Sequence, residues 1–153
     1  MRALDRREAL ALAGGLVALA LTPAAAFAQA AAPAAAAAEA IKKFTGGAEP
    51  ARGKITLDLP EIAENGNTVP LTVTIDSPMT EQSYVREVLI IAEGNPNPNV
   101  AMMTFSPMSG KAEAAVRIRL AATQNVVAVA KMSDGAHFIE KKIVKVTIGG
   151  CGG

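Results

Sequence analysis

The chain has few of the residues on which enzymes and metal sites usually depend. Its 153 residues include one cysteine, one histidine and no tryptophan, and aromatic residues make up 3% of the sequence. A cysteine nucleophile normally needs a nearby base, and a zinc site needs several Cys or His ligands. Phosphate-binding loops and dinucleotide fingerprints are also missing from the sequence. The core must therefore consist of Val, Ile, Leu, Ala and Met, and conventional catalytic machinery is sparse.

The sequence also lacks a large excess of charge of either sign. The chain has 15 Lys and Arg against 14 Asp and Glu. Residues 1–28 contain three of the basic and two of the acidic residues, so a chain without them has 12 of each sign and no net charge. Nucleic acids and anionic membrane surfaces attract clustered positive charge. The charge balance favours neither as a partner.

Residues 1–28 are predicted to be an export signal. The pair Arg6-Arg7 precedes an apolar stretch from Ala9 to Leu21, and Ala26-Phe27-Ala28 provides a small-residue cleavage pattern. The arginine pair resembles a twin-arginine signal, although it lacks the usual Ser or Thr before it and the usual Phe after it. We expect cleavage after Ala28 and a periplasmic protein exported in the folded state. An ordinary secretory signal and an uncleaved membrane anchor are the alternatives.

Residues 29–47 are predicted to form an alanine-rich lead and a short helix. Pro33 interrupts the alanines, so the first residues are expected to be disordered. From Ala34 to Phe44 the high helix propensity of alanine predicts a helix. Ile41 and Phe44, three residues apart, would dock this helix on the following domain. The helix is expected to end at Thr45-Gly46-Gly47.

Residues 48–148 are predicted to form an all-β domain, because apolar residues recur there with a period of two. About seven short strands with turns between them and no intervening helix favour an immunoglobulin-like β-sandwich. The paired cysteines and buried tryptophan of antibody domains are missing. A continuous apolar run in Tyr84–Ala92 predicts a central strand covered on both faces. The predicted strands are Ile55–Leu59, Val69–Ile75, Tyr84–Ala92, Val100–Phe105, Ala114–Leu120, Val126–Met132 and His137–Ile148.

The last five residues, 149–153, place the single cysteine among glycines. Cys151 has Gly149 and Gly150 before it and Gly152 and Gly153 after it. Glycine has no side chain to bury and loses the most backbone entropy on ordering. We therefore expect a mobile carrier arm, residues 149–153, that spans at most roughly 17 Å. Such an arm could present its thiol inside a narrow pocket of another protein.

Other interpretations of these residues remain open at this point. Cys151 could tie two chains together as a structural disulfide. The methionines, with Met102 and Met103 adjacent, could bind Cu(I) in a periplasmic copper protein, although methionine more often fills gaps in a core. His137 is expected to be a loop or surface residue, too far along the last strand to act as a base for Cys151. Glu61 and Glu64 flank a turn and are expected to be solvated.

Four parts of the sequence together resemble the SoxY family of sulfur-carrier proteins. They are the glycine-flanked Cys151, the run Leu57–Pro70, the loop Asn95-Pro96-Asn97-Pro98 and the twin-arginine-like start. The resemblance covers essentially the whole chain, and the cysteine arm is its most specific part.

The resemblance implies a carrier subunit of the Sox thiosulfate-oxidising system that is not itself an enzyme and holds no cofactor or metal. It implies a heterodimer with SoxZ, a second small β-sandwich protein. Cys151 would be conjugated to thiosulfate by a c-type haem enzyme. The arm would then visit a sulfate-releasing hydrolase and, where present, a sulfane dehydrogenase. We expect the partner surface on exposed apolar residues of a sheet face between Val69 and Ile91.

Overall fold

The computed structural model describes residues 24–147 of the chain. Residues 1–23 and 148–153 lie outside this part, and with them the pair Arg6-Arg7 and all of the predicted carrier arm. The described residues therefore comprise the helix, the sandwich and the point where residues 148–153 are attached.

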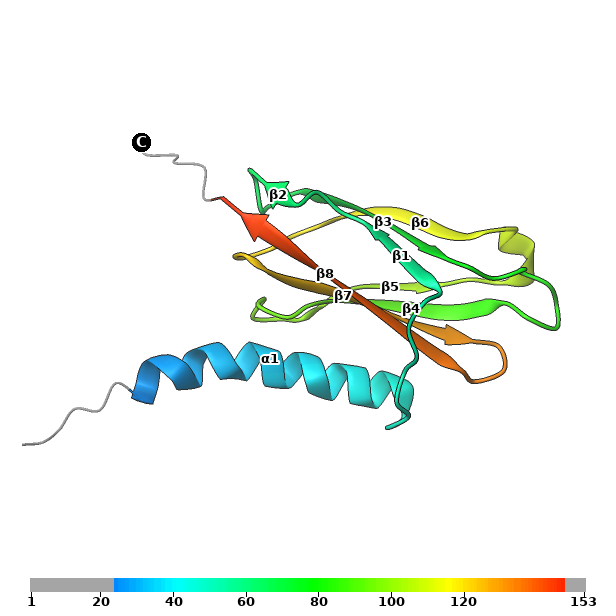
Figure 1. The fold of residues 1–153 in the computed structure, drawn as a ribbon, viewed down its shortest axis with the longest axis horizontal. Coiled ribbons are helices and arrows are strands. Elements are labelled where there is room, and N and C mark those ends of the chain that lie inside the picture. The colour runs from blue at the N-terminus through cyan, green and yellow to red at the C-terminus, as the bar shows by residue number, and fades with distance from the viewer. Residues whose placement is uncertain (1–23, 148–153) are drawn as a thin grey trace, which may run out of the picture.

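Two sheets face each other and form the predicted sandwich (Figure 1). Within the described residues, a three-stranded sheet has the order β1-β3-β6 and a five-stranded sheet has the order β2-β8-β7-β4-β5. All pairs are antiparallel except β2 with β8. The architecture confirms the immunoglobulin-like prediction. The strands are β1 (Ile55–Asp58), β2 (Ile62–Ala63), β3 (Val69–Ile75), β4 (Val85–Ala92), β5 (Asn99–Thr104), β6 (Ala112–Ile118), β7 (Gln124–Met132) and β8 (His137–Val146).

The seven predicted strands are all present, with ends that shift by one or two residues. The two-residue strand β2 was not predicted, because Ile62–Ala63 is too short to show a period. β8 ends at Val146 rather than Ile148. A single turn of 3-10 helix, η1 (Pro107–Ser109), occupies the predicted turn between β5 and β6.

The core of the sandwich consists of aliphatic side chains from both sheets. In β3, Val69, Leu71, Val73 and Ile75 are buried while the residues between them are not, as the alternation predicts. In β4, by contrast, every residue from Val88 to Ala92 is buried, which confirms a strand covered on both faces. β7 shows the same continuous burial from Val126 to Ala130.

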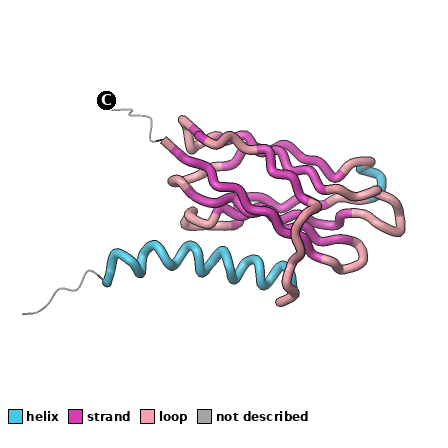
Figure 2. Tube along the Cα trace, in the orientation of Figure 1, coloured by secondary structure: helices cyan, strands magenta, loops and turns pink. Residues whose placement is uncertain are grey.

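Helix α1 (Ala24–Thr45) covers the outer face of the five-stranded sheet. Figures 1 and 2 show it on the side away from the three-stranded sheet. Ala37 is buried against Leu89 and Val127, and Ile41 and Phe44 pack on the same cluster, as predicted. This second layer explains why β4 and β7 are apolar on both faces. Among the described residues, no helix is long and apolar enough to cross a membrane.

The helix begins earlier than predicted, at Ala24 instead of Ala34, and continues through Pro33. The expected disorder of the lead is therefore wrong for the described residues, because an alanine run has enough helix propensity to continue across one missing backbone donor. The predicted end is confirmed. Gly46 and Gly47 have positive φ angles of 65° and 85°, and the Gly47 amide donates to the Lys42 carbonyl at 3.0 Å. This is the glycine-dependent C-terminal motif of helices.

Candidate functional site: the base of the C-terminal arm

The predicted site residues Gly149, Gly150, Cys151, Gly152 and Gly153 lie outside the described residues. The structure describes instead where the arm is attached. β8 runs to Val146, and Thr147 is the last described residue. These two residues are where the described domain joins residues 148–153.

β2 holds the end of β8 on one side. The Lys145 amide donates to the carbonyl of Glu61 at 2.9 Å, and the Thr147 amide donates to the carbonyl of Ala63 at 3.0 Å. Because backbone hydrogen bonds continue to Thr147, the strand stays paired one residue beyond its formal end. Only three residues, 148–150, then separate this fixed point from the cysteine.

Thr123 holds the end of β8 on the other side. The Val146 amide donates to Oγ1 of Thr123 at 3.0 Å, and the Thr123 hydroxyl lies 3.5 Å from the Val146 carbonyl oxygen, to which it donates. β7 begins at the next residue, Gln124, which pairs with Val144. The threonine side chain therefore bonds the end of β8, which lies beyond the last backbone pair between β7 and β8.

Gly66 packs beneath Val146. A Cβ atom at Gly66 would lie 2.9 Å from Cγ1 of Val146 and even closer to the carbonyl oxygen of Leu120. The Leu120 amide also donates to the Gly66 carbonyl at 2.7 Å. Glycine is needed here because two segments approach its backbone too closely for any side chain. We call the following set the arm base: Ala63, Gly66, Thr123, Val146 and Thr147.

A buried polar network fixes the adjacent loops. Asn95 and Gln124 are 8% and 7% exposed, and Nε2 of Gln124 donates to Oδ1 of Asn95 at 2.9 Å. Nδ2 of Asn95 donates to the Arg119 carbonyl at 2.7 Å, and the Ala121 amide donates to Oδ1 of Asn95 at 3.0 Å. The loop that the sequence marks by its prolines is thus joined to the loop that carries Thr123.

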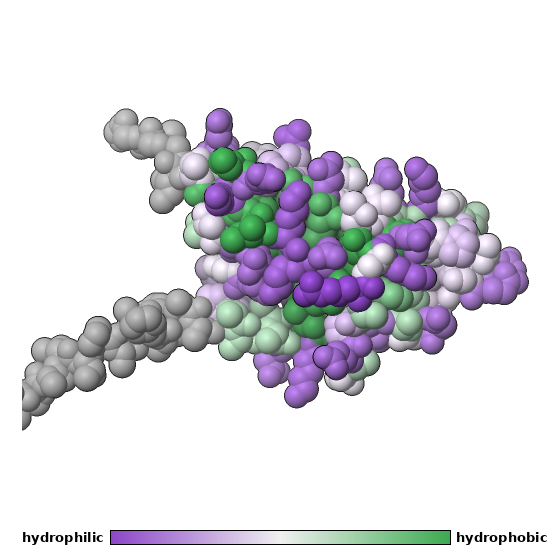
Figure 3. All heavy atoms as spheres, viewed as in Figure 1, coloured by the Kyte–Doolittle hydropathy of each residue, from purple (hydrophilic) through white to green (hydrophobic). Residues whose placement is uncertain are grey.

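Two exposed isoleucines lie beside the arm base. Ile62 and Ile143 are each 56% exposed. Ile62 is the register partner of Lys145, and Ala63 is that of Val146. Since side chains alternate along a strand and Ala63 and Val144 are buried in the core, Ile62, Ile143 and Lys145 share the outer face. Figure 3 shows hydrophobic surface over the ends of β2 and β8.

A charged cluster borders this outer face. Nζ of Lys141 lies 2.8 Å from Oε1 of Glu93, and Nδ2 of Asn125 donates to Oε2 of Glu93 at 2.8 Å. Burial by itself raises the pKa of Glu93. The hydrogen bonds from Lys141 and Asn125, together with the charge of Lys141, outweigh that effect and hold the pKa below its usual value. The carboxylate is therefore ionised at neutral pH and joins β8 to the β4–β5 loop.

His137 lies at the opposite end of β8. Its Nε2 atom is buried without a hydrogen-bond partner in the described residues, and its ring meets that of Phe44 edge to face at 6.3 Å. Burial and then the charge of Lys131 lower its pKa, so the ring is neutral at neutral pH. His137 is therefore more enclosed than the predicted surface histidine.

His137 is also far from the arm. β8 has ten residues, so its ends are about 30 Å apart. The five residues from Val146 to Cys151 span at most roughly 17 Å. A Cys151–His137 pair within one chain is therefore excluded by covalent reach, in agreement with the sequence-based expectation.

The predicted partner surface between Val69 and Ile91 is wrong. Val69, Leu71, Val73 and Ile75 are buried in the sandwich core, and Leu89 and Ile91 are buried beneath α1. The apolar side chains of these strands belong to the protein's own core layers, which leaves no apolar face exposed there. The exposed large hydrophobic residues among the described ones are Ile62, Met102, Met108 and Ile143.

The methionines do not form one surface site. Met79 and Met132 are buried in the core, and Met103 packs against it, whereas Met102 and Met108 are 62% and 96% exposed. Met102 and Met103 point to opposite faces of β5, as expected. The described residues also contain no group of three or more His, Cys, Asp or Glu side chains that could hold a metal ion. Glu61 and Glu64 are exposed, as predicted.

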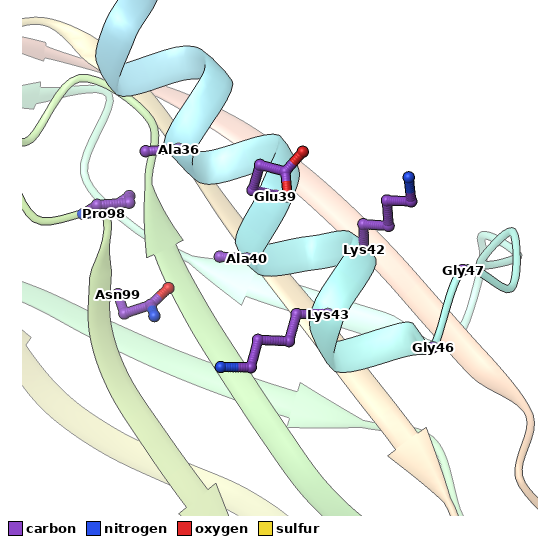
Figure 4. Close-up of a pocket in the computed structure, with 9 residues that line it drawn as sticks. All are labelled: Ala36, Glu39, Ala40, Lys42, Lys43, Gly46, Gly47, Pro98 and Asn99. Carbon is purple, nitrogen blue, oxygen red and sulfur yellow. The ribbon is translucent and has the colours of Figure 1, made fainter.

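An open depression lies between the end of α1 and the start of β5. Ala36, Ala40 and Pro98 form part of its wall, and the side chains of Lys42 and Lys43 extend from the helix beside it (Figure 4). It has no enclosed polar or nucleophilic group that could perform chemistry. The arm base is therefore the stronger candidate for function.

Comparison with known proteins identifies relatives of the chain. The family model described as sulfur oxidation protein SoxY matches residues 41–151. The solved structure of the sulfur carrier protein SoxY from Chlorobium limicola f thiosulfatophilum is 33% identical, covers 75% of this chain and 99% of its own, and has a TM-score of 0.61. No curated protein sequence matches the chain.

Two solved superoxide reductases share the fold. The superoxide reductase (neelaredoxin) from Ignicoccus hospitalis is 17% identical, with 62% of this chain and 81% of its own covered and a TM-score of 0.54. A putative superoxide reductase from Thermotoga maritima is 14% identical, with 69% and 91% covered and a TM-score of 0.52. At these identities the likeness concerns the sandwich alone.

Proposed function

The chain belongs to the SoxY family of sulfur oxidation proteins, and from this membership we propose that it holds sulfur intermediates of thiosulfate oxidation covalently on Cys151. The observation that carries the proposal is the extent of the family match. It ends at residue 151, so it includes the chain's only cysteine and the whole arm base.

The arm base provides the physical reason for a carrier role. Thr147 is paired with β2, and Val146 is bonded to Thr123, so the domain is fixed up to four residues before the thiol. The glycines on both sides of Cys151 provide no side chains that could clash with an enzyme channel. A rigid domain that ends directly before such residues suits a thiol that several enzymes must accept in turn.

Loading the arm is an oxidation and therefore requires a partner. The Cys151 thiol and the outer sulfur of thiosulfate form a disulfide bond, which leaves Cys–S–S–SO₃⁻ and releases one proton and two electrons. A c-type haem enzyme of the Sox system would accept these electrons. Water then cleaves the bond between sulfur and the sulfonate group, releasing sulfate and leaving Cys–S–S⁻ without any change in electron count. The hydrolase would catalyse this second step, and a sulfane dehydrogenase would act on the remaining sulfur.

The remaining features of the proposal concern place and assembly. The chain would act in the periplasm after export by its twin-arginine-like signal. It would form a heterodimer with SoxZ and meet the enzymes transiently. In this role it is a substrate-carrying subunit and not a catalyst.

Reconstitution with purified Sox partners tests the carrier role. Cys151→Ser is expected to abolish thiosulfate-dependent electron release and to leave the melting temperature unchanged, because a cysteine flanked by glycines is expected to contribute little buried area. Gly150→Val is expected to retain loading chemistry but to slow transfer to at least one enzyme. Full activity of Cys151→Ser would refute the proposed role.

A further inference from the structure

Two of the four exposed large hydrophobic residues within residues 33–147 flank the arm base. Ile62 belongs to β2 and Ile143 to β8, and both face outward together with Lys145. Isoleucine is among the residues most often fully buried, and the neighbouring exposed positions Glu61 and Lys141 are charged. An apolar pair at this place therefore needs a reason other than the fold.

We propose that Ile62 and Ile143 form the docking surface for the enzymes that accept the arm, with the apolar mouth of each enzyme's channel seated on them. This inference rests on the proposed carrier function and adds to it the surface through which the carrier is recognised. The occupant is the rim of an active-site channel. Every enzyme that takes up the thiol would use the same surface of the carrier.

The short reach of the arm supports this occupant. From Thr147 to Cys151 the chain spans at most about 14 Å. An enzyme that draws the thiol into a channel must therefore bring its own surface to the arm base. Ile62 lies next to Ala63, whose carbonyl bonds the Thr147 amide, and Ile143 lies four residues before Thr147. Both side chains are thus within the arm's own length of its attachment point and must meet the channel rim.

The groups around Ile62 and Ile143 give this surface features that a partner could recognise. α1 covers Ile139, Val127 and Val129 on the same outer face, and Ile143 continues this apolar face beyond the helix. The Glu93–Lys141 ion pair and its hydrogen bond to Asn125 border it. Lys145 lies beside Ile62 and forms no ion pair within residues 24–147. An apolar rim that carries a carboxylate opposite Lys145 would complement both features.

Met102 and Met108 provide a matched control. They are also apolar and are more exposed than the isoleucines, but neither lies beside the arm base. If exposed apolar area alone determined recognition, substitution of these methionines would have the same effect. If recognition depends on the arm base, they would have none.

The test compares Ile62→Ser/Ile143→Ser with Met102→Ser/Met108→Ser in the heterodimer, using the haem enzyme that loads thiosulfate. The isoleucine variant is expected to raise KM for the carrier about tenfold or more, as the loss of two central interface contacts would. We expect kcat to change little. Labelling of Cys151 by a small disulfide reagent should proceed at the wild-type rate in both variants, which shows that the thiol remains accessible.

Three results would overturn the docking surface while the carrier function stands. They are an unchanged KM in the isoleucine variant, an equal rise in the methionine variant, and loss of the heterodimer in the isoleucine variant, which would assign Ile62 and Ile143 to the permanent subunit interface. A wild-type chain that the haem enzyme cannot load would instead overturn the carrier function itself, and with it this surface.

Discussion

The Val146 amide donates to Oγ1 of Thr123 at 3.0 Å, so the last residue of β8 is bonded to a side chain that stands just before β7 begins. On its other edge the same strand end is paired with β2 through Lys145 and Thr147. The fixed part of the domain therefore extends as far as residue 147. The carrier arm would move from a defined point, and its search for a channel would be confined to the neighbourhood of that point.

Thr123→Val should loosen the arm base without unfolding the protein. The substitution removes the acceptor for the Val146 amide while keeping a β-branched side chain, and one such hydrogen bond contributes about 0.5–1.5 kcal/mol. We expect faster hydrogen exchange at Val146 and a small loss in the free energy of unfolding. Thr104→Val is the control, because Thr104 is exposed and makes no side-chain hydrogen bond in the described part of the chain. Equal exchange rates in the two variants would contradict this role of Thr123.

Gly66→Ala should destabilise the domain by about 1–3 kcal/mol, because a new methyl group must displace Leu120 or Val146. Chemical denaturation measures the loss. Gly94→Ala is the comparison, because its Cβ would lie 3.1 Å from Cβ of Gln124, a milder clash than the one with the Leu120 carbonyl oxygen at Gly66. A smaller loss for Gly66→Ala than for Gly94→Ala would show that the segment beneath Val146 is not tightly packed.

Acid should weaken the fold partly through Glu93. Its pKa is lower in the folded protein than the ordinary value of 4.5, so the unfolded chain binds the proton more readily. The resulting stability is fully present above that ordinary value and is lost as the pH falls through the lower folded pKa. Between about pH 5 and pH 3, Glu93→Gln is therefore expected to lose less stability than the wild type. Identical slopes for Glu93→Gln and the wild type would refute the assignment.

The sequence predicted the parts of the fold that depend on local periodicity. Alternation in Val69–Ile75 and the continuous apolar run to Ala92 matched their burial, and Ile41 and Phe44 dock the helix as expected. The glycines after Thr45 end the helix because they adopt positive φ angles, which residues without a side chain do readily.

The remaining features arise from contacts between distant segments, which no local pattern reveals. Asn95 resembled a loop residue, yet it is buried because Arg119, in the loop before β7, and Gln124, at the start of β7, provide its hydrogen-bond partners. No local signal in the sequence reveals the close approach of Val146 to Gly66. The partner surface was misplaced for the same reason, since alternation shows that a face is buried without showing what covers it.

The covalent state of Cys151 decides whether the protein carries sulfur intermediates. We would measure the intact mass of the protein from cells supplied with thiosulfate, before and after treatment with a reductant, beside Cys151→Ser. We predict added masses that correspond to thiosulfate, sulfonate or extra sulfur on the wild type alone, all removed by the reductant. An unmodified thiol, or a disulfide-linked dimer as the sole product, would contradict it.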